Sequence, residues 1–134
     1  MREVLVDTDI LSLYFRGDKK VKNKFQTYLK NFNFINISII TYYEILSGLK
    51  YKDAKKQLSK FKEFCNENNI LELTLNSTEI SANLYERLRK EGNLIDDIDL
   101  LIAGIAIENE LIVATNNENH FRKIKEIKIE NWSK

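Results

Sequence analysis

The chain has 134 residues, of which 43% are hydrophobic and 31% charged, and its formal net charge is +1. This composition is typical of one globular domain and excludes a disordered chain, and the balanced charge excludes a bulk basic field for nucleic acid. One cysteine and one histidine exclude an intrachain disulfide and the usual zinc sites, so a bound metal would be held mainly by oxygen.

Apolar runs and helical periodicity alternate along the chain and predict alternating strands and helices. The expected strands are short and largely apolar, at 3–6, 34–37, 70–73, 111–115 and, more weakly, 125–129. The expected helices cover 10–15, 20–31, 40–49, 53–68, 77–90 and 97–109. Ser38 and Asn76 are expected to cap helices, with Glu79 completing a capping box after Asn76 and Gly92 closing that helix.

This alternation predicts the fold class. Strands joined through helices imply right-handed crossovers and a parallel sheet. We therefore expect an α/β fold, a three-layer α/β/α sandwich with a mostly parallel central sheet, in a single domain over 1–134. The functional crevice of such a sheet lies at the carboxyl ends of its strands. Asp7 follows the first strand, and Thr115 and Asn116 stand where the strand at 111–115 ends.

Asp99 is a charged residue at a position where packing alone would favour an apolar one. It falls on a stripe of apolar residues in a helix that is apolar on most of its sides. Burying an ionised carboxylate there costs several kcal/mol, on the order of 3–5, unless a proton, a basic partner, a cap role or a cation neutralises it. The cap role is the structural alternative, but Asp96 and Asp97 are already available for it.

Two further carboxylates also follow or lie within apolar segments. Asp7 follows an apolar strand, where an Asp either serves a site or caps the next helix. Glu44 lies in a largely apolar helix, and Gly48 one turn later leaves space for close helix packing or for a ligand. Three such carboxylates suit an oxygen-only site for Mg²⁺ or Mn²⁺, and their mutual repulsion would raise their pKa values without metal.

Lysines cluster at 19–24 and at 50–62. The simplest interpretation is a pair of solvated helix faces. The alternative is a rim that contacts phosphate, which gains weight only if an acidic nuclease site lies nearby.

Four motifs, in this order, resemble those of PIN-domain proteins, and in particular the VapC-type toxins of bacterial and archaeal toxin–antitoxin pairs. They are VDTDIL at 6–11, YEILSG at 43–48, DIDLLIA at 97–103 and VATNN at 113–117 with Phe121. The likeness spans nearly the whole chain, down to IENWS at 129–133. It implies a PIN fold and a Mg²⁺- or Mn²⁺-dependent endoribonuclease that cleaves structured RNA, such as a tRNA or rRNA loop, by attack of an activated water on a phosphodiester. It also implies a homodimer and a cognate antitoxin protein that blocks the active site.

The resemblance also implies roles for individual residues. By position, Asp7 and Asp99 correspond to the principal metal ligands, and Glu44 to the further acidic residue that positions the metal or its water. Thr8 would orient Asp7. Asn116 stands at the fourth site position, where many relatives have Asp, so a second metal would bind more weakly here. An auxiliary set would assist these residues, with Asp97 or Glu118 offsetting the missing charge: Thr8, Asp97, Thr115 and Asn116.

Three other functions stay open from the sequence. One is a PIN nuclease of RNA maturation, and another is a PIN-like module that binds without cutting. The third is a haloacid-dehalogenase-like phosphatase with Asp7 as nucleophile, although Leu11 departs from its motif. The compact length favours the toxin, and three repelling carboxylates argue against a silent site. No apolar run approaches the roughly 20 residues of a membrane span and the N-terminus lacks a signal-peptide pattern, so we expect a cytoplasmic protein that does not engage a membrane.

Overall fold

The computed structural model describes residues 2–134, whose strands form one five-stranded sheet in the order β3-β2-β1-β4-β5. All four neighbouring strand pairs run parallel. The strands are β1 (Val4–Val6), β2 (Asn36–Ser38), β3 (Asn69–Leu71), β4 (Ile112–Ala114) and β5 (Ile129–Glu130). The helices are α1 (Thr8–Phe15), α2 (Lys19–Leu29), α3 (Ile39–Tyr51), α4 (Lys55–Glu67), α5 (Leu75–Lys90), α6 (Asp97–Glu108) and α7 (Glu118–Phe121).

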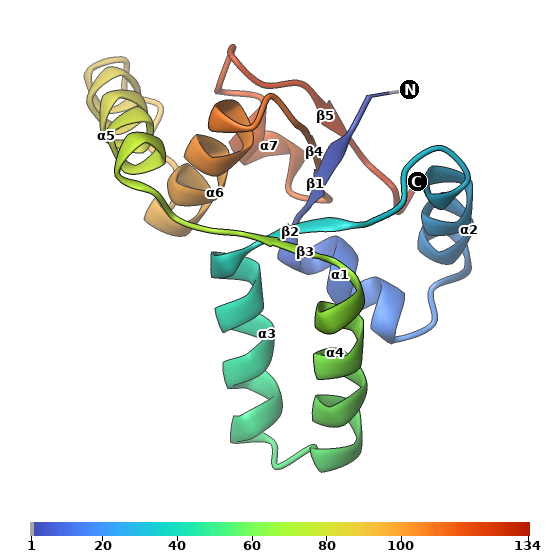
Figure 1. The fold of residues 1–134 in the computed structure, drawn as a ribbon. Helices are drawn as coiled ribbons and strands as arrows, with labels where there is room; N and C mark the ends of the chain where they lie inside the picture. Colours follow the sequence, from blue (N-terminus) through green and yellow to red (C-terminus); the bar gives the residue numbers. More distant parts are fainter. Residues whose placement is uncertain (1) are drawn as a thin grey trace.

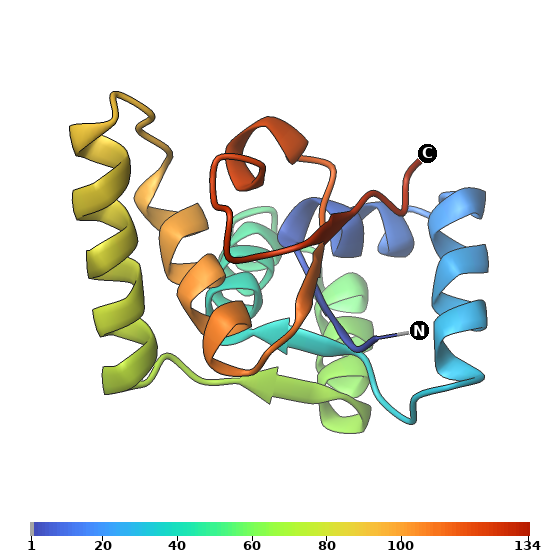
Figure 2. The same ribbon diagram turned by 90° about the horizontal axis from the view of Figure 1, so that it is seen from above.

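Helices cover both faces of the sheet, with α5 and α6 on one side and α2 on the other (Figure 2). Side chains alternate between the two faces of a strand. Val4 and Val6 accordingly pack in a core with α1, α2 and α4, whereas Leu5 packs in a second core with α5 and α6. The expected three-layer α/β/α sandwich with a parallel sheet is confirmed.

The helices α3 and α4 lie side by side and project together from the sheet (Figure 1). On the opposite layer, α5 and α6 approach closely where Gly104 lacks a side chain. A Cβ atom at Gly104 would lie 2.4 Å from the carbonyl oxygen of Ser77. In the described part of the chain, no helix is long and apolar enough to cross a bilayer.

Two local predictions were wrong. Thr74, not Asn76, caps α5: its hydroxyl accepts the Ser77 N–H at 2.9 Å, and the Ser77 hydroxyl accepts the Thr74 N–H at 3.0 Å. The amide of Asn76 instead donates to Glu108.

The last strand lies at Ile129–Glu130 rather than 125–129, because its pairing with β4 fixes its position and local alternation does not. The short helix α7 was not expected at all, whereas Ser38 caps α3 as predicted.

Candidate acidic site

A cavity of about 550 Å³ lies where β1 and β4 end. These two strands are neighbours in the sheet, so the residues that follow them meet at one edge. Four carboxylates line the cavity: Asp7, Asp9, Glu44 and Asp99. The three carboxylates selected from the sequence are therefore brought together, and a fourth joins them.

Asp7 serves as a helix cap and as a wall of the cavity at once. Its Oδ1 accepts the backbone N–H of Thr8 at 2.8 Å, which caps α1, and its Oδ2 accepts the Thr115 hydroxyl at 2.7 Å. The side chain is buried. Burial and the nearby charge of Asp9 raise the pKa of Asp7 to about 7, although the two hydrogen bonds act in the opposite direction.

Asp9 lines the cavity although it was not predicted as a site residue. Its carboxylate accepts the backbone N–H of Asn116 at 3.1 and 3.3 Å, which ties α1 to the segment after β4. Burial, with a smaller repulsion from Asp99, raises the pKa of Asp9. Its position two residues after Asp7, at the end of the same strand, could have indicated that it belongs to the site.

Glu44 reaches the cavity from α3 and is held there by α1. The hydroxyl of Thr8 donates to Oε1 of Glu44 at 2.6 Å and also lies 2.9 Å from the hydroxyl of Thr41. The side chain of Thr8 was expected to orient Asp7. Instead it orients Glu44, and only the backbone N–H of Thr8 contacts Asp7.

Asp99 is buried in the first turn of α6 but does not serve as its cap. The N-cap position belongs to Asp96, which makes no side-chain capping bond. Oδ2 of Asp99 instead lies 2.6 Å from Nδ1 of His120 and 3.0 Å from Nδ2 of Asn117. Neither His120 nor Asn117 was predicted as a site residue. One feature of the sequence could have indicated them: the only histidine lies within one helical turn of the asparagines that follow the strand.

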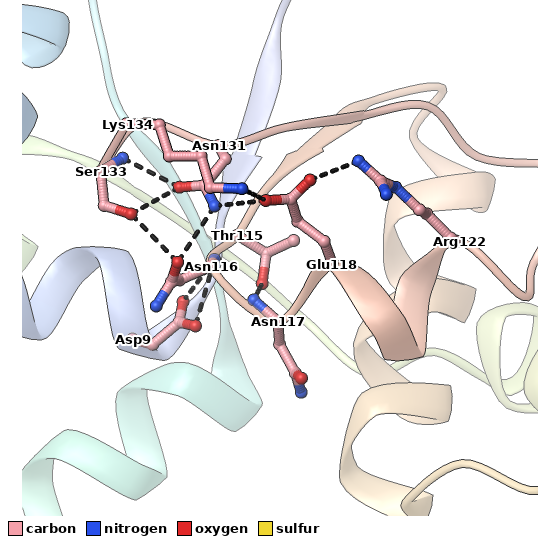
Figure 3. A network of polar contacts seen from close by, with 9 residues as sticks. All are labelled: Asp9, Thr115, Asn116, Asn117, Glu118, Arg122, Asn131, Ser133 and Lys134. Carbon is pink, nitrogen blue, oxygen red and sulfur yellow. Dashed lines mark hydrogen bonds and ion pairs between the residues drawn. The ribbon is translucent and has the colours of Figure 1, made fainter.

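Asn116 lines the cavity, and its side-chain oxygen is bound to the C-terminal segment (Figure 3). Its Oδ1 accepts the Asn131 amide at 3.0 Å and the Ser133 hydroxyl at 3.1 Å. The same network holds Glu118, which forms an ion pair with Lys134 at 2.8 Å. That contact, the Asn131 amide and nearby cations lower the pKa of Glu118.

The structure does not place Asp97 or Glu118 on the wall of the cavity. Asp97 is exposed, and Glu118 is turned to the C-terminal segment. Neither residue stands where it would offset the neutral Asn116. The remaining auxiliary residue, Thr115, does reach the site through its bond to Asp7.

The donor set of the cavity fits Mg²⁺ or Mn²⁺. Within residues 2–134, no three carboxylate, imidazole or thiol groups stand together as a ready-made metal cage, and each central carboxylate is bound to its own partner. Such cages are not what Mg²⁺ requires, since it takes one or two carboxylates and completes its coordination with water and phosphate oxygens. Burial, and to a lesser extent the charges of Asp9 and Asp99, raise the pKa of Asp7, and a bound divalent cation would offset this repulsion.

Comparison with known proteins agrees with this geometry. Residues 4–127 match the family model of the PIN domain. The chain is 32% identical over 135 residues to "Ribonuclease VapC1" of Methanocaldococcus jannaschii, covering 98% of this chain and 88% of that protein. It is 25% identical over 138 residues to "tRNA(fMet)-specific endonuclease VapC" of Shigella flexneri, covering 99% and 100% of the two chains. The fold superposes with a TM-score of 0.88 on the solved structure of VapBC2 from Rickettsia felis bound to a promoter DNA fragment, at 27% identity over 96% of this chain and 98% of that one.

Proposed function

This chain belongs to the PIN-domain family, and we propose that it is a divalent-metal-dependent endoribonuclease that acts as the toxin of a toxin–antitoxin pair. The observation that carries the proposal is the wall of four carboxylates at one edge of the sheet. Carboxylates without a cationic partner are costly at buried positions, and Asp7 is only 5% exposed. A site that gathers them is suited to hold a cation together with a polyanionic substrate. We further propose that residues 1–134 form one PIN domain.

We assign Asp7, Asp99 and Glu44 as the residues that hold Mg²⁺ or Mn²⁺. When bound, the cation would offset charge on the phosphodiester and make an attacking water more acidic. The protein's own contribution is to hold the carboxylates in place. Thr115 fixes Oδ2 of Asp7, and Thr8 fixes Oε1 of Glu44. Oriented partners of this kind keep ligand oxygens in position and preserve their affinity for metal.

The substrate and partners of the proposed enzyme follow from its relatives. The Shigella flexneri relative is named as a tRNA-specific endonuclease, which supports structured RNA, such as a tRNA or rRNA loop, as the substrate class. The Rickettsia felis structure is a VapBC2 complex, which supports a cognate antitoxin as the protein partner. We also propose that the chain acts as a homodimer, as the family resemblance implies.

The test is RNA cleavage in the presence of Mn²⁺ or Mg²⁺ by the wild type, Asp7→Asn and Asp99→Asn. Each substitution keeps the size of the side chain and removes its charge, so both variants should lose at least about 100-fold in rate. Asp96→Asn is the matched control. Asp96 precedes the same helix, is exposed and does not line the cavity, so its variant should cut like the wild type.

The same assay separates the other functions. A module that only binds RNA would show no metal-dependent cleavage by the wild type, and Asp7→Asn and Asp99→Asn cutting as fast as the wild type would refute the assigned site. A maturation nuclease would cut RNA without inhibiting growth when expressed alone. The phosphatase alternative is removed by the PIN match over residues 4–127.

A further inference from the structure

A second cavity, of about 580 Å³, adjoins the acidic one and lies between α1, α3 and the start of α4. The two cavities share four lining residues: Thr8, Ser12, Arg16 and Glu44. They are therefore continuous, and we call the second one the α1–α3–α4 groove. A chain that leaves the acidic site past Glu44 enters this groove directly.

The groove has an apolar lining that includes an aromatic ring open to solvent. Phe15, Ile45 and Leu49 contribute to it, and Phe15 is 41% exposed. The groove is open beside Gly48, since a Cβ atom there would have no atom within 4 Å outside its own helix backbone. Of the two explanations for the space beside Glu44, close helix packing is thus excluded, and room for a ligand remains.

The rim of the groove is positively charged. Arg16, Lys52 and Lys60 line it, all three are exposed, and their side chains make no hydrogen bond or ion pair within the described part of the chain. The lining holds a single carboxylate, Glu44, at the end shared with the acidic site. Lys52 and Lys60 belong to the lysine cluster at 50–62. The condition for a phosphate-contacting rim, an acidic site nearby, is met for these two lysines.

We propose that the α1–α3–α4 groove binds the single-stranded RNA segment next to the cleaved phosphodiester. The phosphates of this segment contact Arg16, Lys52 and Lys60, and an unpaired base lies against Phe15. Lysine and arginine bind phosphate regardless of base sequence, and aromatic faces stack on unpaired bases. The volume of the groove lies in the range of small-ligand sites, about 300–1,000 Å³, which suits nucleotides of one strand rather than a duplex.

This inference rests on the proposed function. If the acidic site binds an RNA phosphodiester, RNA is favoured over an acidic peptide as the ligand of the groove. A phosphodiester held at the acidic site is part of a longer chain, so its neighbouring nucleotides must lie over adjoining surface. The groove is adjoining surface of this kind, with charge opposite to that of RNA.

The test measures RNA binding in an Asp7→Asn background with Mn²⁺, using a fluorescein-labelled oligouridylate and varied salt. The double variant Lys52→Gln/Lys60→Gln should bind on the order of tenfold more weakly, and its salt slope should fall by about 1.4, or 0.7 for each lost phosphate contact. Lys55→Gln/Lys56→Gln is the matched control. Both of its lysines are exposed on α4 outside the groove and carry the same charge, so its affinity should stay near that of the parent.

A second variant blocks the groove without changing charge. Gly48→Leu places a good helix former where the space is open, so the protein should fold, and its binding of oligouridylate should fall while Gly48→Ala binds normally. If the lysine pair and Gly48→Leu bind oligouridylate like their controls, the groove proposal is overturned, while cleavage of RNA by the wild type still supports the proposed function. If these variants weaken binding of polyglutamate but not of oligouridylate, the groove is a peptide site and the proposal is equally overturned. A wild type that cuts no RNA would overturn the proposed function and this inference together.

Discussion

Nδ1 of His120 lies 2.6 Å from Oδ2 of Asp99, so the only histidine of the chain is bound to a carboxylate of the proposed metal site. Since a carboxylate accepts, the proton of this bond is assigned to Nδ1. Asn117 donates to the same oxygen. The other oxygen, Oδ1 of Asp99, makes no hydrogen bond within residues 2–134 and is free to bind a cation.

His120→Ala should therefore weaken Mn²⁺ binding by about 10- to 100-fold, because removing a partner that orients a metal ligand has effects of this size. His120→Asn should retain most of the affinity, since the amide nitrogen of Asn occupies nearly the place of Nδ1. Electron paramagnetic resonance of free Mn²⁺, without RNA, measures both. Equal affinities for wild type, Ala and Asn variants would show that His120 does not position Asp99.

The raised pKa of Asp7 makes the stability of the metal-free protein depend on pH. The pKa is about 7 in the fold against an ordinary value of 3.8, so between these values the folded state holds a proton that the unfolded chain has lost. Stability must then fall as pH rises through this window. From pH 5 to pH 8 we expect a loss of about 3 kcal/mol from this group. Urea unfolding with EDTA present measures it.

Asp7→Asn is the control for this pH effect because an amide does not titrate. Its stability should change less between pH 5 and pH 8 than that of the wild type. At pH 8, Mn²⁺ should stabilise the wild type more than Asp7→Asn, since binding to the folded state alone raises its stability. Parallel pH curves for the two proteins would contradict the assignment of the raised pKa to Asp7.

The C-terminal segment should hold the strand-end loop in its site geometry. Asn131 donates to Asn116 at 3.0 Å and to Glu118 at 2.7 Å (Figure 3). Asn131→Ala removes these two bonds and the two that its Oδ1 accepts from Ser133. Each is worth about 1 kcal/mol, so amide hydrogen exchange at Asn116 and Asn117 should quicken by roughly tenfold or more. Lys134→Ala is the comparison, because the exposed Lys134 binds Glu118 and makes no bond to Asn116. If these amides exchange at the same rate in Asn131→Ala and Lys134→Ala, the bonds of Asn131 do not hold the loop.

Two glycines should respond in opposite ways to alanine. Gly104→Ala should destabilise the protein by about 1–3 kcal/mol despite better helix propensity, because its Cβ would overlap the backbone of α5. Gly48→Ala meets open space and should stabilise α3 by up to about 1 kcal/mol. Urea denaturation of both variants shows whether each substitution raises or lowers the free energy of unfolding. Stabilisation by Gly104→Ala would mean that the close contact between α5 and α6 is not rigid.

Local sequence signals were sufficient for most of the helices and strands, though not for α7 or the position of β5, and for three of the four carboxylates. Helical and strand periodicity depend on residues a few positions apart, so they could be read along the chain. Asp99 stood out because a charge on an apolar stripe is costly wherever the helix packs. The α5 cap was misplaced because Thr74 and Asn76 offer similar capping chemistry and only the packed structure chooses between them.

The α/β alternation and the choice of Asp7, Glu44 and Asp99 as candidate ligands could be predicted from residue type and spacing. The tertiary structure alone decided the partners. Thr115 binds Asp7 across 108 positions of the chain, and His120 binds Asp99 from a helix that no periodicity announced. The groove beside Glu44 likewise exists only once α1, α3 and α4 are packed. Such contacts depend on which strands become neighbours, which is a property of the whole fold and not of any local segment.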